Sequence, residues 1–388
     1  MSDTILKYNG LTEHKETLPV EWYLDEQHYQ REMAAIWYKN WVYVCRADAL
    51  AQPRAFRTQQ IGSQNILVLR TEEGGLQAFH NTCRHRGSVL VTETEGVMRS
   101  KNIMCPYHNW TYSQQGELIR TSSKQCPASF DMAEHSLYDV AVVDWNGFVF
   151  VNLAGQDAQP IEQCIGADAN AFANWPAAAL KVGASYSKTM DCNWKVFWEN
   201  YNECLHCPGV HKDLSKLVPI YRRNYMTACD DPNWQENLKS DDPALRGGMR
   251  AGAQTWTTDG QPIGAVFPNL SDAERTQAFT YVDVHPTAFI VGHVDYMRIV
   301  RIMPLGPEKT EIQAEWLFME ETLNDPAVDI APAVDFVKQV MAEDAHVSEL
   351  NQAGMHSIRH KKGSLMPEEY AVHDFHNWVR AQLAASES

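Results

Sequence analysis

Two short segments of the chain each carry a cysteine followed closely by a histidine: Cys83-Arg84-His85 and Cys105-Pro106-Tyr107-His108. The surrounding residues, 41–155, form short runs rich in Val, Ile, Phe and Tyr, which is typical of β-strands separated by turns. Predicted strands cover 41–45, 65–70, 76–80 and 148–153. If both segments bind one metal centre, their loops must meet, and this requirement constrains how the small β domain folds.

The order of the ligands indicates which centre this is. In a Rieske [2Fe–2S] cluster two cysteines bind one iron and two histidines bind the other. Two loops that each offer one sulfur and one nitrogen can hold both irons from opposite sides. A structural zinc site with two Cys and two His is the alternative, but zinc sites usually pair like ligands at short spacing. We therefore predict that Cys83, His85, Cys105 and His108 bind a [2Fe–2S] cluster.

A second group of potential ligands lies at 199–211, where Glu203, His206 and His211 fall within nine positions. Two imidazoles and a carboxylate on one face are what a mononuclear non-haem iron(II) site needs. We predict a helix over 194–205 that Pro208 and Gly209 end just after His206, so that His211 can fold back. On an unbroken helix the two histidines would be roughly 140° apart. The alternative is a helix end with two solvated or hydrogen-bonded histidines.

Composition narrows the class of protein. With 33 basic and 49 acidic residues the net charge is −16, which disfavours nucleic acid and anionic membranes as partners. No run approaches the roughly 18 apolar residues of a membrane span, and the first residues do not resemble a secretory signal. Nine cysteines, an odd number in a large chain, favour a reducing cytoplasm over a disulfide framework.

The second half of the chain predicts an α+β domain. Alternating apolar residues predict antiparallel strands over 279–284, 288–294, 296–304 and 311–318, with a turn at Gly306-Pro307. Helical patterns cover 160–175, 328–354 and 367–383, and residues 221–264 are irregular and read as pocket loops. We expect 1–40 to be an N-terminal helical segment packed on a catalytic domain of 156–388, with 41–155 as the all-β cluster domain.

Cys83–Gly87, Cys105–Trp110 and Glu199–His211 resemble the two cluster loops and the iron motif of Rieske non-haem iron oxygenase α subunits. The resemblance covers essentially the whole chain. It implies a helix-grip catalytic domain in which His206, His211 and Asp344 bind a mononuclear Fe(II). It also implies that Glu203 is a bridge to the cluster histidine His108 of a neighbouring subunit, that Asn200 lies beside the iron, and that the assembly is a homotrimer.

The resemblance also implies a reaction. No G-x-G-x-x-G follows a strand, so a flavin and NAD(P)H would act only through a separate flavin/iron–sulfur reductase. The iron motif and residues 375–380 resemble the quaternary ammonium group of glycine betaine, carnitine, choline and stachydrine monooxygenases. We expect O2-dependent hydroxylation of an N-methyl group, giving N-demethylation and formaldehyde. The alternatives are ring hydroxylation of an aromatic carboxylate and, from a different class, a Rieske electron carrier without oxygen chemistry.

Other residues near these motifs receive plainer interpretations. Cys204 and Cys207 are expected to be packed thiols that flank His206, and not a redox pair. His346, His356 and His360 are expected on the surface. Aromatic faces would suit a methylated ammonium, but most of the aromatic residues in the pocket-forming region are expected to be core or rim: Trp234, Trp256, Phe267, Phe279, Tyr281 and Tyr296.

Overall fold

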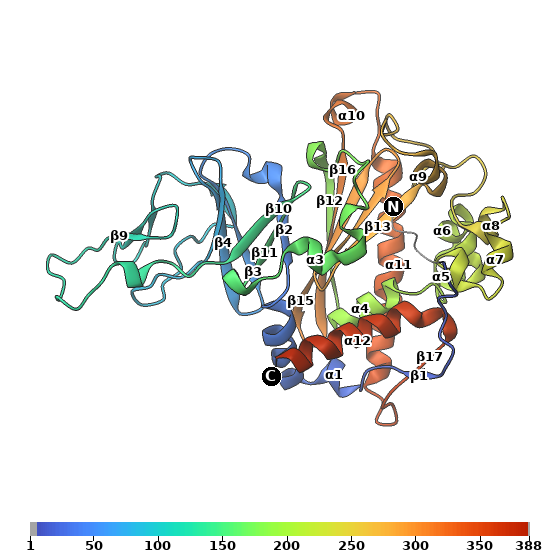
Figure 1. Cartoon of the computed structure of the whole chain (residues 1–388), viewed down its shortest axis with the longest axis horizontal. Coiled ribbons are helices and arrows are strands. Elements are labelled where there is room, and N and C mark those ends of the chain that lie inside the picture. The colour runs from blue at the N-terminus through green and yellow to red at the C-terminus, as the bar shows by residue number, and fades with distance from the viewer. Residues whose placement is uncertain (1–5, 387–388) are drawn as a thin grey trace. The chain divides into compact units, whose positions relative to one another are not determined.

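The computed structural model describes residues 6–386 and divides into two compact units (Figure 1). The smaller unit contains residues 36–166 together with 284–288. The larger unit contains the remaining described residues, 6–35, 167–283 and 289–386. Residues 1–5 of the predicted N-terminal segment lie outside the described residues, and the domain boundaries expected from the sequence stay a prediction.

The smaller unit is built from three antiparallel sheets. The first has the order β10 (Ala141–Trp145), β11 (Phe148–Asn152), β2 (Val42–Arg46). The second has the order β5 (Leu76–His80), β4 (Gln64–Arg70), β3 (Ala55–Ile61), β6 (Glu95–Val97), and the third the order β7 (Ile103–Met104), β8 (Thr111–Tyr112), β9 (Leu118–Arg120). The strands β2, β4, β5 and β11 fall within two residues of their predicted positions. The predicted β domain is thereby confirmed.

The larger unit contains a five-stranded antiparallel sheet with the order β12-β16-β15-β14-β13. Its strands are β13 (Phe279–Val284), β14 (Ala288–His293), β15 (Met297–Gly306), β16 (Lys309–Phe318) and β12 (Lys181–Met190). Four of them were predicted, and Gly306 pairs with Lys309 at the expected turn. Strand β12 was not predicted because it consists mostly of small and polar residues. The α+β class of the chain is confirmed.

Helices complete the larger unit, and α4 (Trp194–Tyr201) is the central one. It contacts strand β15, and helices α11 (Ala331–Met355) and α12 (Tyr370–Ala385) pack against it. The short helices are α1 (Glu21–Leu24), α2 (Glu26–Glu32), α5 (Cys207–Val210), α6 (Lys212–Leu217), α7 (Trp234–Asn237), α8 (Pro243–Arg246), α9 (Asp272–Gln277) and α10 (Glu320–Asn324). Among residues 6–386, no helix is both long and apolar enough to cross a membrane.

Two predicted helices differ from the structure. The 160–175 segment is helical only at α3 (Ile161–Ile165) and continues as 3-10 turns, because Gly166 adopts a positive φ of 73° and closes the helix. Helix α4 ends at Tyr201, before Glu203, and Asn202 is its C-cap. Pro208 therefore ends no helix: it lies in the first turn of α5, where a missing N–H costs nothing.

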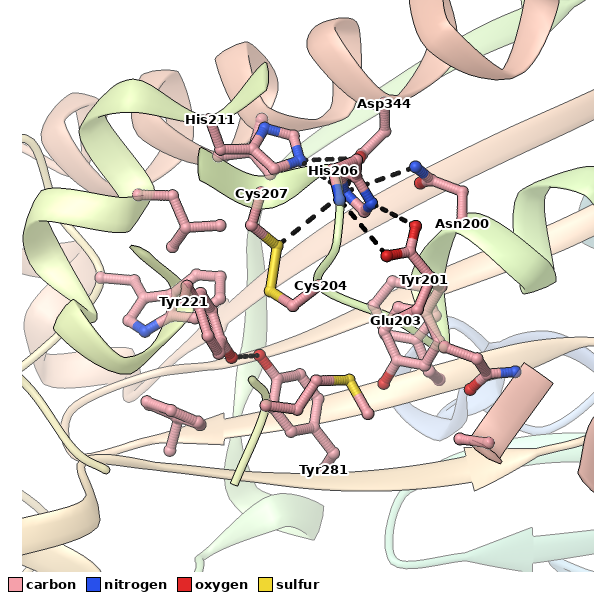
Figure 2. A pocket seen from close by; sticks show the side chains of 18 of the residues that line it. Asn200, Tyr201, Glu203, Cys204, His206, Cys207, His211, Tyr221, Tyr281 and Asp344 are labelled. Atoms are coloured by element: carbon pink, nitrogen blue, oxygen red, sulfur yellow. Dashed lines mark hydrogen bonds and ion pairs between the residues drawn. A yellow bond between two sulfur atoms is a disulfide. The ribbon is translucent and has the colours of Figure 1, made fainter. Parts of the chain in front are cut away.

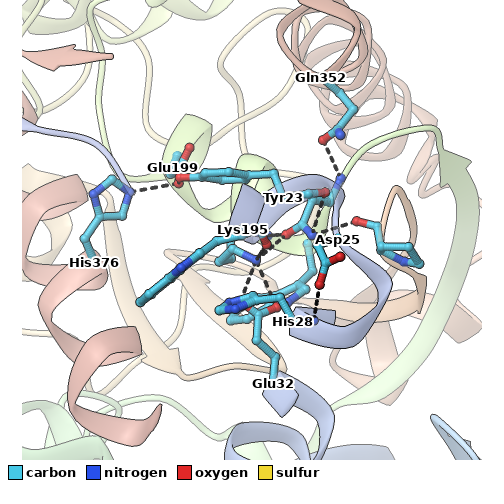
Figure 3. Close-up of polar contacts among 12 residues, drawn as sticks. Tyr23, Asp25, His28, Glu32, Lys195, Glu199, Gln352 and His376 are labelled. Atoms are coloured by element: carbon cyan, nitrogen blue, oxygen red, sulfur yellow. Dashed lines mark hydrogen bonds and ion pairs between the residues drawn. The ribbon is translucent and has the colours of Figure 1, made fainter. Parts of the chain in front are cut away.

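The N-terminal segment is held to helix α4 by a buried ion pair (Figure 3). Lys195 and Glu32 are both fully buried, and Nζ of Lys195 lies 2.7 Å from Oε1 of Glu32. The same ammonium donates to the carbonyl oxygen of Trp22 at 2.9 Å. Nearby, Glu199 of α4 accepts hydrogen bonds from Tyr23 at 2.5 Å and His376 at 2.8 Å. These contacts fix the helix that carries Asn200 and leads to Glu203.

Candidate functional site

The two Cys/His segments of the smaller unit form loops with the same backbone pattern. The N–H of Cys83 donates to the carbonyl of Ser88 at 2.8 Å, and the N–H of Cys105 donates to that of Trp110, also at 2.8 Å. The fourth residue after each cysteine has a positive φ, 79° at Gly87 and 56° at Asn109. Each loop is therefore a tight turn that presents its sulfur and its imidazole from a rigid frame.

The four side chains differ in burial, the two cysteines from the two histidines. Cys83 and Cys105 are buried, whereas His85 is exposed and His108 half-buried. The rings of His85 and His108 lie 4.7 Å apart, and His85 stacks on Trp110. The hydroxyl of Tyr112 lies 3.2 Å from the Cys83 sulfur and can donate to a thiolate. Two buried sulfurs and two more accessible imidazoles on neighbouring loops fit the ligand set of a Rieske cluster, with two cysteines for one iron and two histidines for the other.

In the larger unit, His206, His211 and Asp344 point toward one another (Figure 2). Nε2 of His206 lies 3.1 Å from Nε2 of His211. Oδ1 of Asp344 lies 2.8 Å from Nε2 of His211 and 3.4 Å from Nε2 of His206. His206 and His211 flank the short helix α5, and Asp344 comes from α11, more than 130 residues later. The predicted ligand set is thus brought together.

Each imidazole is oriented by a second carboxylate. Nδ1 of His206 lies 2.6 Å from Oε1 of Glu203, and Nδ1 of His211 lies 2.7 Å from Oε2 of Glu343. Because a carboxylate accepts hydrogen bonds, both Nδ1 atoms carry a proton, and both Nε2 atoms face the centre, where they can bind a metal ion. This carboxylate–histidine arrangement is the usual support of a metal-binding histidine.

The spacing of the three converging atoms fits a metal ion. Two lone pairs and a carboxylate oxygen in mutual contact repel one another unless a positive charge lies between them. Ligand atoms about 2.1 Å from one metal and about 90° apart lie about 3 Å from each other, close to the separations found here. Among residues 6–386 this is the one group of three His, Cys, Asp or Glu side chains with that proximity.

The carboxylates around His206 favour a positive charge at its Nε2, which either a proton or a metal ion can supply. Burial alone would lower its pKa, but hydrogen bonds to Asp344 and Glu203 outweigh that effect and raise the pKa to about 9. Asn200, at the end of α4, brings its side-chain amide within 3.4 Å of Nε2 of His206. All of the residues expected at the iron site, including Asn200, therefore lie within one constellation.

One expectation near this site is wrong. Cys204 and Cys207 are joined by a disulfide, whereas packed thiols were expected. The bond closes a four-residue loop that contains His206, so it limits how far this ligand can move. A redox pair was rejected because the C-x-x-C motif lacks a βαβ context. That criterion applies to thioredoxin-like folds and does not decide whether two cysteines near the start of a short helix form a disulfide.

A cavity of about 360 Å³ opens onto the three ligands. Its apolar walls are largely aromatic: Phe197, Tyr201, Tyr221, Trp256, Phe279, Tyr281 and Phe289. Tyr201 stacks on Phe289 with ring centroids 4.0 Å apart, and its hydroxyl donates to Asp283 at 3.1 Å. Burial raises the pKa of Asp283 to about 7, although the Tyr201 hydrogen bond opposes the rise.

Part of this lining was predicted from the sequence. Trp256, Phe279 and Tyr281 do line the cavity, whereas Trp234, Phe267 and Tyr296 do not. Four further lining residues, Tyr201, Asp283, Phe289 and Arg298, were not predicted, nor was the contact of Glu343 with His211. A signal was available for Arg298 alone, since it is a charged residue within the apolar run 297–300.

Comparison with known proteins agrees with this geometry. Residues 40–134 match the Rieske [2Fe-2S] domain, and residues 177–385 match the catalytic domain of the ring hydroxylating alpha subunit family. Glycine betaine monooxygenase oxygenase subunit from Chromohalobacter salexigens is 28% identical, over 93% of this chain and 84% of that protein. Choline monooxygenase from Arabidopsis thaliana is also 28% identical, over 94% and 82%.

A solved structure shares the fold. The apo form of the quaternary ammonium Rieske monooxygenase CntA superposes with a TM-score of 0.70 at 23% identity, covering 95% of this chain and 96% of that one. The match to the catalytic domain of an oxygenase family argues against the alternative of a Rieske electron carrier without oxygen chemistry. The chain belongs to the ring hydroxylating alpha subunit family and is a Rieske-type oxygenase related to quaternary ammonium monooxygenases.

Proposed function

We propose that the chain is the terminal oxygenase of a two-component monooxygenase that demethylates a betaine-like quaternary ammonium compound. The observation that carries the proposal is the aromatic cavity that opens onto His206, His211 and Asp344. A quaternary ammonium has no N–H to donate, and aromatic faces attract it electrostatically without requiring a hydrogen bond. The volume, about 360 Å³, is within the range of small-molecule sites.

The proposed reaction replaces one C–H bond of an N-methyl group by C–OH. O2, two electrons and two protons give the N-hydroxymethyl ammonium and water. The C–N bond then breaks as the hydroxyl proton leaves, which yields the tertiary amine, formaldehyde and a proton. When bound by His206, His211 and Asp344, an iron(II) would supply the activation of O2. The protein's part is to hold the methyl group toward these ligands, with aromatic walls that exclude water.

The electrons are proposed to arrive from a separate flavin/iron–sulfur reductase that oxidises NAD(P)H, by way of the [2Fe–2S] cluster. A second hollow of about 340 Å³ supports Glu203 as the entry point, since it is lined by Glu199, Asn200, Glu203 and His206. Glu203 therefore borders two openings. We propose that His108 of a neighbouring subunit docks at the second, in a head-to-tail homotrimer. The expected cytoplasmic location stays a prediction.

Ring hydroxylation of an aromatic carboxylate is the second candidate, because aromatic walls also accommodate a benzene ring. A turnover assay separates the two. The holoenzyme, a surrogate reductase and NADH are incubated with a panel of betaines and benzoates, and formaldehyde and hydroxylated products are measured. Formaldehyde from a betaine in step with NADH oxidation is expected. Ring hydroxylation of benzoates without formaldehyde from any betaine would overturn the proposal.

A further inference from the structure

A buried arginine lines the cavity without a carboxylate partner. Arg298 lies on β15, near the middle of the five-stranded sheet, and is only 4% exposed. Its Nε has no hydrogen-bond partner, and among the described residues its guanidinium forms no ion pair with a carboxylate. Its nearest aromatic neighbours are Trp256 and Phe289, whose ring centroids lie 5.8 and 5.9 Å from its Cζ.

The same strand shows how an arginine is ordinarily satisfied. Arg301, three residues later, is bonded at 3.0 Å to Glu311 on the neighbouring strand β16. Arg298 has no such partner, although a buried charge is costly to leave unpaired. An anionic group on a bound ligand would pair with the guanidinium and remove this free-energy cost.

The other charged groups of the cavity are already engaged. Glu203 and Asp344 contact the histidines. Asp283 accepts a hydrogen bond from the Tyr201 hydroxyl. Burial raises the pKa of Asp283 to about 7, so its carboxyl group is only partly ionised at neutral pH. The charge of Arg298 partly offsets the rise that burial causes in the pKa of Tyr281, as expected for a cation that faces the same space.

We infer that Arg298 binds a carboxylate of the substrate, so that the pocket selects zwitterions carrying both a quaternary ammonium and a carboxylate. The guanidinium forms two parallel hydrogen bonds with a carboxylate, which fixes orientation as well as charge. A single guanidinium balances a monoanion, whereas a phosphate would leave excess negative charge in a cavity that already contains Asp344 and Glu203. The quaternary ammonium part of this selectivity rests on the proposed function.

Calorimetric binding to the holoenzyme, without reductase, tests it with two matched pairs of ligands. Glycine betaine and its methyl ester share the trimethylammonium group, and benzoate and benzamide share the ring. Wild type is expected to bind glycine betaine at least about thirty-fold more tightly than the ester. Arg298→Gln should abolish this preference and leave ester binding within about twofold. Arg301→Gln, outside the cavity, is the matched control and should retain it.

Arg298→Lys is a conservative control for misfolding. It keeps the buried positive charge but loses the planar guanidinium that forms two parallel hydrogen bonds. It should retain the cluster absorbance and show a preference reduced by about tenfold. If neither ammonium ligand binds but benzoate binds in an Arg298-dependent manner, the proposed function fails and the carboxylate role stands. The inference is overturned if neither glycine betaine nor benzoate loses affinity in Arg298→Gln. It is also overturned if this substitution weakens the binding of a carboxylate and of its uncharged partner equally.

Discussion

The carboxylate of Glu203 contacts His206 through both of its oxygens: Oε1 lies 2.6 Å from the ring Nδ1, and Oε2 accepts from the backbone N–H at 3.3 Å. Glu203 therefore lies on the side of the imidazole that faces away from Asp344. An acid three residues before a histidine could have been its fellow ligand. The geometry instead makes it an outer partner, with Asp344 on the ligand side.

Glu203→Gln is expected to keep both metal sites and to lose turnover. The glutamine oxygen can still accept from Nδ1 of His206, so the ligand keeps its orientation, but the negative charge and the proposed bridge are lost. Iron and sulfide analysis should give about three irons per two sulfides, as in wild type. Loss of the mononuclear iron from this variant would mean that the roles of Glu203 and Asp344 are reversed.

Asp344→Ala is expected to lose the mononuclear iron and to keep the cluster. Without the oxygen that lies 2.8 Å from Nε2 of His211, only two imidazoles remain to hold the ion. The visible spectrum of the cluster should be unchanged, while the iron content falls to about two per two sulfides. Asp335→Ala, an exposed acid on the same helix, is the matched control.

Glu343→Gln addresses the outer partner of His211. The carboxylate 2.7 Å from Nδ1 makes this imidazole a better donor to a metal. Loss of such an outer partner typically weakens metal affinity by about 10–100-fold. Chelator competition should show this loss for the mononuclear iron alone. An unchanged affinity would show that the Glu343 contact does not support the ligand.

The ligands could be named from the sequence, but their arrangement could not be derived from local periodicity. His206 and His211 meet because α4 ends at Tyr201 and a new helix starts at Cys207. Pro208 was correctly recognised as a discontinuity and wrongly given the role of a helix end. Asp344 was found only through the resemblance of its motif to known oxygenases, since nothing local distinguishes it from a solvated acid on a long helix.

The cavity wall was harder to predict because it is assembled by the sheet. Phe289 and Arg298 lie on strands β14 and β15, and both faces of these strands are buried. With no alternation between buried and exposed positions, a strand's sequence does not reveal which side chains face the helices and which face the cavity. The aromatic residues that line the cavity are therefore indistinguishable from core residues before the fold is known.

Tyr281 provides a test of the aromatic wall. Its ring lies edge-on to Trp256 and Phe279, and its hydroxyl lies 3.4 Å from that of Tyr221. Replacing the ring by Leu should weaken trimethylammonium binding by about 3- to 30-fold, the range of a cation–π contact. Tyr281→Phe keeps the face and should bind within about twofold of wild type. Calorimetry with glycine betaine measures both, and equal loss in the two variants would contradict the role of the ring.

The buried pair of Lys195 and Glu32 is expected to control how firmly the N-terminal segment is held. Lys195→Met leaves the fully buried carboxylate of Glu32 without its cation, and breaking such a pair costs about 3–5 kcal/mol. Denaturant unfolding of the transition that includes helix α4 should show this loss. Lys195→Met combined with Glu32→Leu removes both charges and should recover much of it, because an apolar pair of similar volume leaves no unpaired charge.

The pH dependence of the same unfolding transition tests the contribution of Glu32. Burial alone would raise the pKa of Glu32, but Lys195 and His28 outweigh burial and hold the pKa below its ordinary value of 4.5. The folded state therefore binds this proton more weakly than the unfolded state does. The stabilisation is present above about pH 4.5 and is lost as the pH falls below it. The double variant lacks the carboxylate, so its stability should fall less steeply on acidification. An identical acid dependence in wild type and double variant would show that Glu32 is not the group responsible.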